Sequence, residues 1–193
     1  MDFTRKNYKW TLGGLSKCIE DNKLESQIVA YTDTAAIVHV KNYHDSQILG
    51  AESDWCISQH KSSWEQYVSK NKRIQLFFYN FSKFVKDNMD LVGATFVADK
   101  KNVSLFCCFG KNNHPINEYY AKQGVKSDSE TLERFILIDN FGYDLNNTEF
   151  KEIVINAKKD NEEKQPTIDY VASYSWPVYY YPDYDDDYDV LYT

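Results

Sequence analysis

The stretch LVGATFVADKKNVSLFCCFG, Leu91 to Gly110, holds two apolar runs that are separated by four turn-forming residues. Both runs, 92–98 and 103–109, contain the β-branched and aromatic side chains that favour strands. A connection as short as DKKN allows the two runs to pair with each other as an antiparallel hairpin. We therefore expect an antiparallel sheet that includes this part of the chain.

Three further apolar runs lie before this hairpin and extend the predicted sheet. Residues 28–31 and 36–40 flank the turn-like sequence TDT, which predicts a second hairpin. The sequence RIQLFFYNF predicts another strand, from Ile74 to Tyr79. We expect these runs to belong to the same antiparallel sheet.

Short helices are predicted between and after these strands. YHDSQILGA predicts a helix that ends at Gly50, and SSWEQYVSKN predicts a second helix with Ser62 or Ser63 as its N-cap. A third helix is expected from about residue 130 to residue 138, whereas FKEIVINAKK fits a helix or a strand. The predicted fold class is α+β, an antiparallel sheet with short helices packed on one face.

Charge divides the chain of 193 residues into two parts. Nine of the 29 acidic residues but only one basic residue, Lys164, fall in residues 160–193, while residues 1–159 are close to neutral. A single α+β domain is therefore predicted for 1–159, and an acidic, tyrosine-rich C-terminal extension for 160–193. The composition of the whole is globular, with aromatic residues at 16%.

The extension interleaves phenol rings with carboxylates in YSWPVYYYPDYDDDYDVLYT. A terminus that serves only as a solvated tail needs no aromatic side chains, and rings beside carboxylates are suited to contact with a basic protein surface. The predicted partner-binding residues are Tyr179, Tyr180, Tyr181, Asp183, Tyr184, Asp185, Asp186, Asp187 and Asp189. The alternative interpretation is a solvated terminus.

The four cysteines indicate neither a metal site nor a disulfide framework. No pair has the C-x₂-C spacing of a zinc site, and the adjacent Cys107 and Cys108 lie in an apolar strand where thiols pack as small hydrophobic groups. We predict no metal and no cofactor. No apolar stretch approaches the roughly 20 residues that span a bilayer, so the expected location is cytoplasmic, with no membrane partner.

Cys56 and His60 are the strongest candidates for catalysis in the sequence. A thiolate with an imidazole in reach is a nucleophile and its base, and a helix N-terminus would lower the pKa of the thiol. Against an enzyme, the sequence lacks the phosphate-binding loops, the nucleophile elbow and the zinc-hydrolase motif. The other interpretation is a buried Cys56 beside a core Trp55, without catalysis.

Direct binding of nucleic acid is disfavoured. Basic residues flank the predicted ring-rich β-strand in YVSKNKRIQLFFYNFSKFVK, and such an arrangement is typical of sites that bind single-stranded nucleic acid. However, residues 1–159 carry almost no net charge and attract polyanions weakly.

The segment 36–79 resembles a small domain that recurs in proteins of large tailed bacteriophages. In that domain a strand, a short helix ending near glycine, a Trp-Cys-Ile or Trp-Cys-Thr element, an aromatic-x-x-Tyr helix and an aromatic strand follow one another. The matching residues here are Gly50, Trp55, Cys56, Ile57, Trp64, Tyr67 and the strand Leu76–Tyr79. The resemblance implies a phage origin and a structural role for Trp55 and Cys56 at the seam between sheet and helix, and the domain has no established activity.

A phage protein without catalytic motifs and with an acidic, ring-rich extension is suited to work by contact. The expected function is that of a host-takeover or counter-defence factor, which binds and inhibits a host protein or toxin acting on nucleic acid. The expected partner is a host protein with a basic, nucleic-acid-binding surface. The alternatives are a Cys-dependent enzyme that uses Cys56, and a phage structural or assembly protein.

Overall fold

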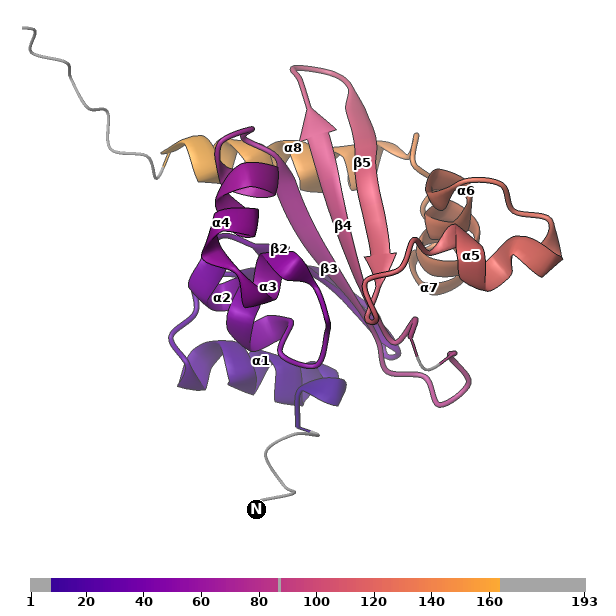
Figure 1. Cartoon of the computed structure of the whole chain (residues 1–193), viewed down its shortest axis with the longest axis horizontal. Coiled ribbons are helices and arrows are strands. Elements are labelled where there is room, and N and C mark those ends of the chain that lie inside the picture. Colours follow the sequence, from indigo (N-terminus) through magenta and orange to yellow (C-terminus); the bar gives the residue numbers. More distant parts are fainter. Residues whose placement is uncertain (1–7, 87, 164–193) are drawn as a thin grey trace, which may run out of the picture.

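The computed structural model describes residues 8–86 and 88–163, which form a five-stranded antiparallel sheet and its covering helices (Figure 1). The strands are neighbours in chain order, and every neighbouring pair is antiparallel. They are β1 (Gln27–Tyr31), β2 (Ala35–Val40), β3 (Ile74–Asn80), β4 (Leu91–Ala98) and β5 (Val103–Gly110). The α+β class, the two predicted hairpins and the central strand are confirmed.

The helices fall into three groups along the chain. They are η1 (Tyr8–Trp10) and α1 (Leu12–Asp21) before β1; α2 (Tyr43–Leu49), α3 (Cys56–Gln59), α4 (Lys61–Trp64) and η2 (Glu65–Ser69) between β2 and β3; and α5 (Asn117–Tyr120), η3 (Ala121–Gln123), α6 (Asp128–Leu132), η4 (Glu133–Ile138), α7 (Asp139–Phe141) and α8 (Thr148–Glu163) after β5. Within the described ranges, no helix is both long enough and apolar enough to cross a membrane.

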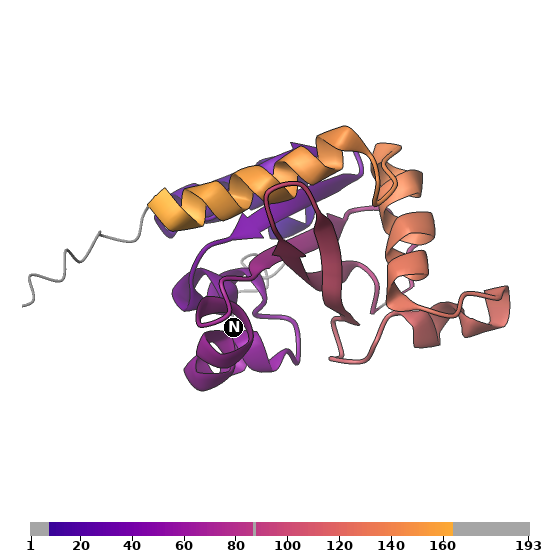
Figure 2. The same ribbon diagram turned by 90° about the horizontal axis from the view of Figure 1, so that it is seen from above.

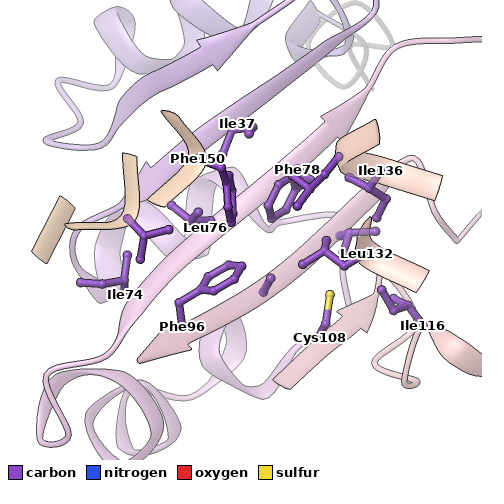
Figure 3. Packing of buried hydrophobic residues seen from close by; sticks show 14 of the residues in the cluster. Ile37, Ile74, Leu76, Phe78, Phe96, Cys108, Ile116, Leu132, Ile136 and Phe150 are labelled. Atoms are coloured by element: carbon purple, nitrogen blue, oxygen red, sulfur yellow. The ribbon is translucent and has the colours of Figure 1, made fainter. Parts of the chain in front are cut away.

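Helices cover both faces of the sheet, which corrects the expectation that they pack on one face (Figures 1 and 2). Leu76 and Phe78 of β3 pack with α6, η4 and α8, whereas Phe77 and Tyr79 pack with α1 and the α2–α4 group. Figure 3 shows the first of these cores, in which Phe150 of α8 lies over the sheet. The physical reason is that β3 is apolar on both sides, and both sides must therefore be removed from water.

Local signals found the three predicted helices but placed two of their starts incorrectly, and they missed η1, α1, α3, α5, η3 and α7. Helix α4 begins after His60, whose side chain makes no capping hydrogen bond, so neither Ser62 nor Ser63 is the N-cap. The predicted third helix begins at Asp128, where the Ser127 hydroxyl accepts a hydrogen bond from the Glu130 amide. Both helices continue as wider π-helical turns, η2 and η4, a form that short-range patterns do not reveal.

The ambiguous sequence FKEIVINAKK belongs to the longest helix, α8. Phe150, Val154 and Ala157 recur at helical spacing and are buried against the sheet. Helix α8 continues past the predicted boundary at residue 159, and Asp160 pairs with Lys41 of the β2–α2 connection, with 2.5 Å between Oδ2 and Nζ. Residues 160–163 of the predicted extension are therefore helical, and residues 164–193 lie outside the described part of the chain.

Trp55 joins the α2–α4 group to the sheet. Its indole Nε1 donates a hydrogen bond of 2.7 Å to the carbonyl of Gly110 at the end of β5, and its ring centroid lies 4.7 Å from that of Phe77. The ring also lies against Gly93 of β4, where an added Cβ would come within 3.1 Å of it. Trp55 is 2% exposed, so the predicted core position of this ring is confirmed.

We expect Trp55→Ala to lower the free energy of unfolding by about 3–5 kcal/mol, the cost of a large buried truncation. The reason is the loss of the ring's packing on Phe77 and Gly93 together with its hydrogen bond to Gly110. Urea unfolding measures the change, with Phe84→Ala as a control that should remain within about 0.5 kcal/mol because Phe84 is 98% exposed. An unfolding midpoint for Trp55→Ala equal to that of the control would contradict the structural role.

Candidate functional site

A pocket of about 300 Å³ lies beside Trp55, between the α3–η2 segment and strands β3 to β5. We call it the ring pocket. Its lining residues are Trp55, Cys56, Ile57, Tyr67, Gln75, Gly93, Thr95, Phe106, Cys107, Phe109 and Asn113. Four of them, from Trp55 to Tyr67, come from the connection between β2 and β3, so the pocket has a helical wall and a sheet wall.

The sheet wall is a row of residues that strand register brings together. Gln75 pairs with Thr95 between β3 and β4, and Thr95 pairs with Cys107 between β4 and β5. Side chains of paired residues point to the same face of a sheet. A polar amide, a hydroxyl and a thiol therefore line one side of an otherwise apolar hollow.

The amide of Gln75 is buried and only partly hydrogen-bonded. Its side chain belongs to a residue that is 1% exposed, and its Oε1 accepts a 2.5 Å hydrogen bond from Thr95 Oγ1. Within residues 8–86 and 88–163, no acceptor meets the two protons of Gln75 Nε2. The Nε2 atom is not one of the buried polar atoms that lack a partner in this part of the chain, so it keeps some contact with solvent in the pocket and can donate to an acceptor atom of a bound group.

Aromatic rings form much of the remaining surface. Tyr67 and Phe106 remain 42% and 48% exposed at the mouth of the pocket. Phe106 is the extra residue of a β-bulge, because Thr95 pairs with Cys107 while Phe96 pairs with Leu105. A bulge turns a side chain away from its regular direction, which accounts for the position of this ring.

Arg73 links the two rings at the mouth. Its guanidinium lies 3.5 Å from the centroid of the Phe106 ring, and its Nη1 donates a 2.9 Å hydrogen bond to the carbonyl of Tyr67. Cation–π contact of this kind fixes a ring that would otherwise be free to turn. Arg73 belongs to residues 70–73, Lys-Asn-Lys-Arg, which we call the basic turn.

A second pocket, of about 210 Å³, lies on the other side of the basic turn. Lys72 and Arg73 line it together with Lys158, Asn161 and Glu162 near the end of α8. Arg73 therefore lines the second pocket and also contacts Phe106, a lining residue of the ring pocket. The end of α8 and the ring pocket are neighbours across a single side chain.

Two thiols lie in the ring pocket. Cys56 is the first residue of α3 and is half-buried, which corrects the expectation that it is fully buried. Cys107 is also half-buried; burial raises the pKa of its thiol, and a hydrogen bond with Thr95 and the charge of Arg73 reduce that shift. Cys108 faces the opposite core and is fully buried, as expected for a small hydrophobic group.

The predicted nucleophile and base share no side-chain hydrogen bond. His60 is exposed and ends α3, where its backbone amide donates a 2.8 Å hydrogen bond to the carbonyl of Cys56. No hydrogen bond joins the Cys56 thiol to the His60 imidazole, and none of the described histidines lines the ring pocket. The arrangement is suited to holding a flat group rather than to acid–base chemistry.

The predicted partner-binding residues lie outside the described residues, and so their role stays a prediction. They are Tyr179, Tyr180, Tyr181, Asp183, Tyr184, Asp185, Asp186, Asp187 and Asp189. Sequence reasoning missed Gln75, Thr95 and Phe106. A lone Gln and a lone Thr inside apolar strands were the available signal, but only the strand register shows that they meet.

No family model, no curated protein and no solved structure matches this chain. The resemblance to a phage domain therefore stays a prediction. Four of the residues that carry it, Trp55, Cys56, Ile57 and Tyr67, line the ring pocket.

We expect the four thiols to react with iodoacetamide in two classes. Cys56 and Cys107 should react in the native protein, whereas Cys18 and Cys108, which are buried, should react only after unfolding in urea. The rate at Cys107 should still be rising above pH 9.0, the ordinary thiol value, because its raised pKa delays formation of the thiolate. Mass spectrometry of timed samples measures each site, and equal rates at Cys56 and Cys108 would contradict the pocket.

Proposed function

We propose that the protein acts by contact, as a host-takeover or counter-defence factor that binds and inhibits a host protein acting on nucleic acid. In this proposal the ring pocket receives one flat side chain of the partner. The acidic extension contacts a basic surface beside it. The assignment to a phage rests on the resemblance of residues 36–79, and the mode of action rests on the pocket.

An aromatic pocket that Gln75 lines with an available amide donor carries this proposal. Apolar pockets with a few fixed polar groups are the usual form of binding sites, and 300 Å³ is at the small end of their range. A volume of this size suits a single large side chain or ring. Half-exposed rings such as Tyr67 and Phe106 are frequent anchors at protein interfaces.

A Cys-dependent enzyme is the second candidate, and one observation favours it. Cys56 is the first residue of a helix, is half-buried and faces a pocket. Iodoacetamide distinguishes the two proposals. Labelling of Cys56 faster than that of glutathione at the same pH would support a reactive thiol, whereas slower labelling than that of glutathione would support a binding pocket.

The binding proposal predicts distinct kinetic effects at the pocket and in the extension. After affinity capture identifies a host protein, Tyr67→Ala and Phe106→Ala should each speed its dissociation by about 10- to 100-fold, the effect of removing an interface anchor. Replacing Asp183, Asp185, Asp186, Asp187 and Asp189 with Asn should mainly slow association and reduce its dependence on salt, because complementary charge steers encounter. Surface-binding kinetics measures both rates.

Tyr31→Ala is the matched control for the ring variants. Tyr31 is 66% exposed on β1, at the edge of the sheet opposite β5, and its loss should leave both rates unchanged. The captured protein should also lose its activity on nucleic acid when this chain is added in excess. Retained activity of a partner that is saturated with the chain would refute inhibition, and unchanged kinetics for all ring variants would refute the pocket as the contact site.

A further inference from the structure

We propose that the ring pocket also binds this chain itself. A tyrosine within residues 179–184 enters the pocket, and the neighbouring aspartates lie on the basic turn, residues 70–73. This segment lies outside the described residues, and the inference about it comes from the chemistry of the pocket, the charge at its rim and the place where helix α8 ends. The docking does not depend on the proposed function, whereas its effect on partner binding does.

The pocket favours a phenol over a purely aliphatic group. Its aromatic walls suit a flat ring, because aromatic pairs gain free energy beyond that of burial alone. Gln75, which lines the pocket, offers its Nε2 protons to an acceptor atom. A tyrosine supplies both features, since its hydroxyl oxygen can accept the amide proton while its ring contacts Tyr67 and Phe106.

The rim of the pocket favours an acidic segment. Lys70 and Lys72 are exposed and Arg73 is half-buried, and no acidic residue lies within the basic turn. Two acidic residues, Glu25 and Glu162, line the second pocket together with Lys72 and Arg73. Residues 179–189 hold five tyrosines, five aspartates and no basic residue, so their composition complements both the rings and the charge.

The end of α8 places this segment within reach. Asn161 and Glu162 line the second pocket with Lys72 and Arg73, so the chain leaves the described part beside the basic turn. Residues 164–178 separate that point from Tyr179. They span up to about 50 Å when extended, at about 3.3 Å per residue, whereas a domain of this size has a radius of gyration of about 15 Å. Length therefore does not prevent docking.

Self-docking would make the segment a competitor of the partner. The same rings cannot contact the extension and a host protein at one time. A tethered segment acts at a high effective concentration, and a partner must therefore displace it. In the free protein this contact also removes the half-exposed rings from water.

Thiol protection tests the docking in the full-length chain without any partner. The variant Tyr179→Ser, Tyr180→Ser, Tyr181→Ser, Tyr184→Ser should react with iodoacetamide at Cys56 about tenfold faster than the native chain, which corresponds to docking in roughly nine native molecules in ten. Cys18 and Cys108 should remain unreactive in both proteins, which shows that the fold is intact. A peptide of residues 176–190 added to the variant should restore slow labelling.

The matched control is Tyr170→Ser, Tyr174→Ser, which removes rings from the same extension outside the docking segment and should leave the rate at Cys56 unchanged. Equal rates at Cys56 in the native chain and the four-tyrosine variant would overturn the proposal. Protection that rises with protein concentration would also overturn it, because it would assign the contact to a second copy of the chain. Since no host protein is present, failure here leaves the proposed partner binding to be judged by its own kinetics.

Discussion

The position of the α2–α4 helices on the sheet depends on the indole of Trp55. This side chain is the contact that attaches the long β2–β3 connection to strands β3, β4 and β5. Its Nε1 reaches the carbonyl of Gly110, and the preceding amide, that of Asp54, donates a 2.8 Å hydrogen bond to the carbonyl of Lys111. The acceptors of the two bonds are Gly110, the last residue of β5, and Lys111, which follows it. The helices of this connection are thereby fixed at one height above the sheet, and the ring pocket is the space they leave uncovered.

The sequence was sufficient to predict the strands but not to predict which faces of the sheet the helices cover. Apolar runs with short turns predicted β4 and β5 and their pairing, since these signals are local. The one-sided packing was wrong because β3 is apolar at consecutive positions such as Leu76 and Phe77, and the prediction treated it as half-exposed. The contact between Gln75 and Thr95 depends on register, which short-range patterns do not fix.

The pocket and the acidic extension account for different parts of the proposed binding. A small, mainly apolar pocket with an amide donor at Gln75 selects the shape and the acceptor of a single group. A charged segment adds attraction over a longer range but little geometric selectivity. The position of Arg73, between the two pockets, brings both kinds of contact to the same edge of the molecule.

In this antiparallel meander, the order of the strands and the shape of the pocket are set by different parts of the chain. Each strand pairs with its neighbour in the chain, so the sheet does not rely on the β2–β3 connection for its order. Helices α2, α3 and α4 all lie in that single insertion, which supplies Trp55, Cys56, Ile57 and Tyr67 to the pocket. Residues 41–73 thus cover one face of the sheet and supply the helical wall of the pocket, so the shape of the pocket can change by substitution in this one segment without altering the order of the strands, provided that the Trp55 anchor is kept.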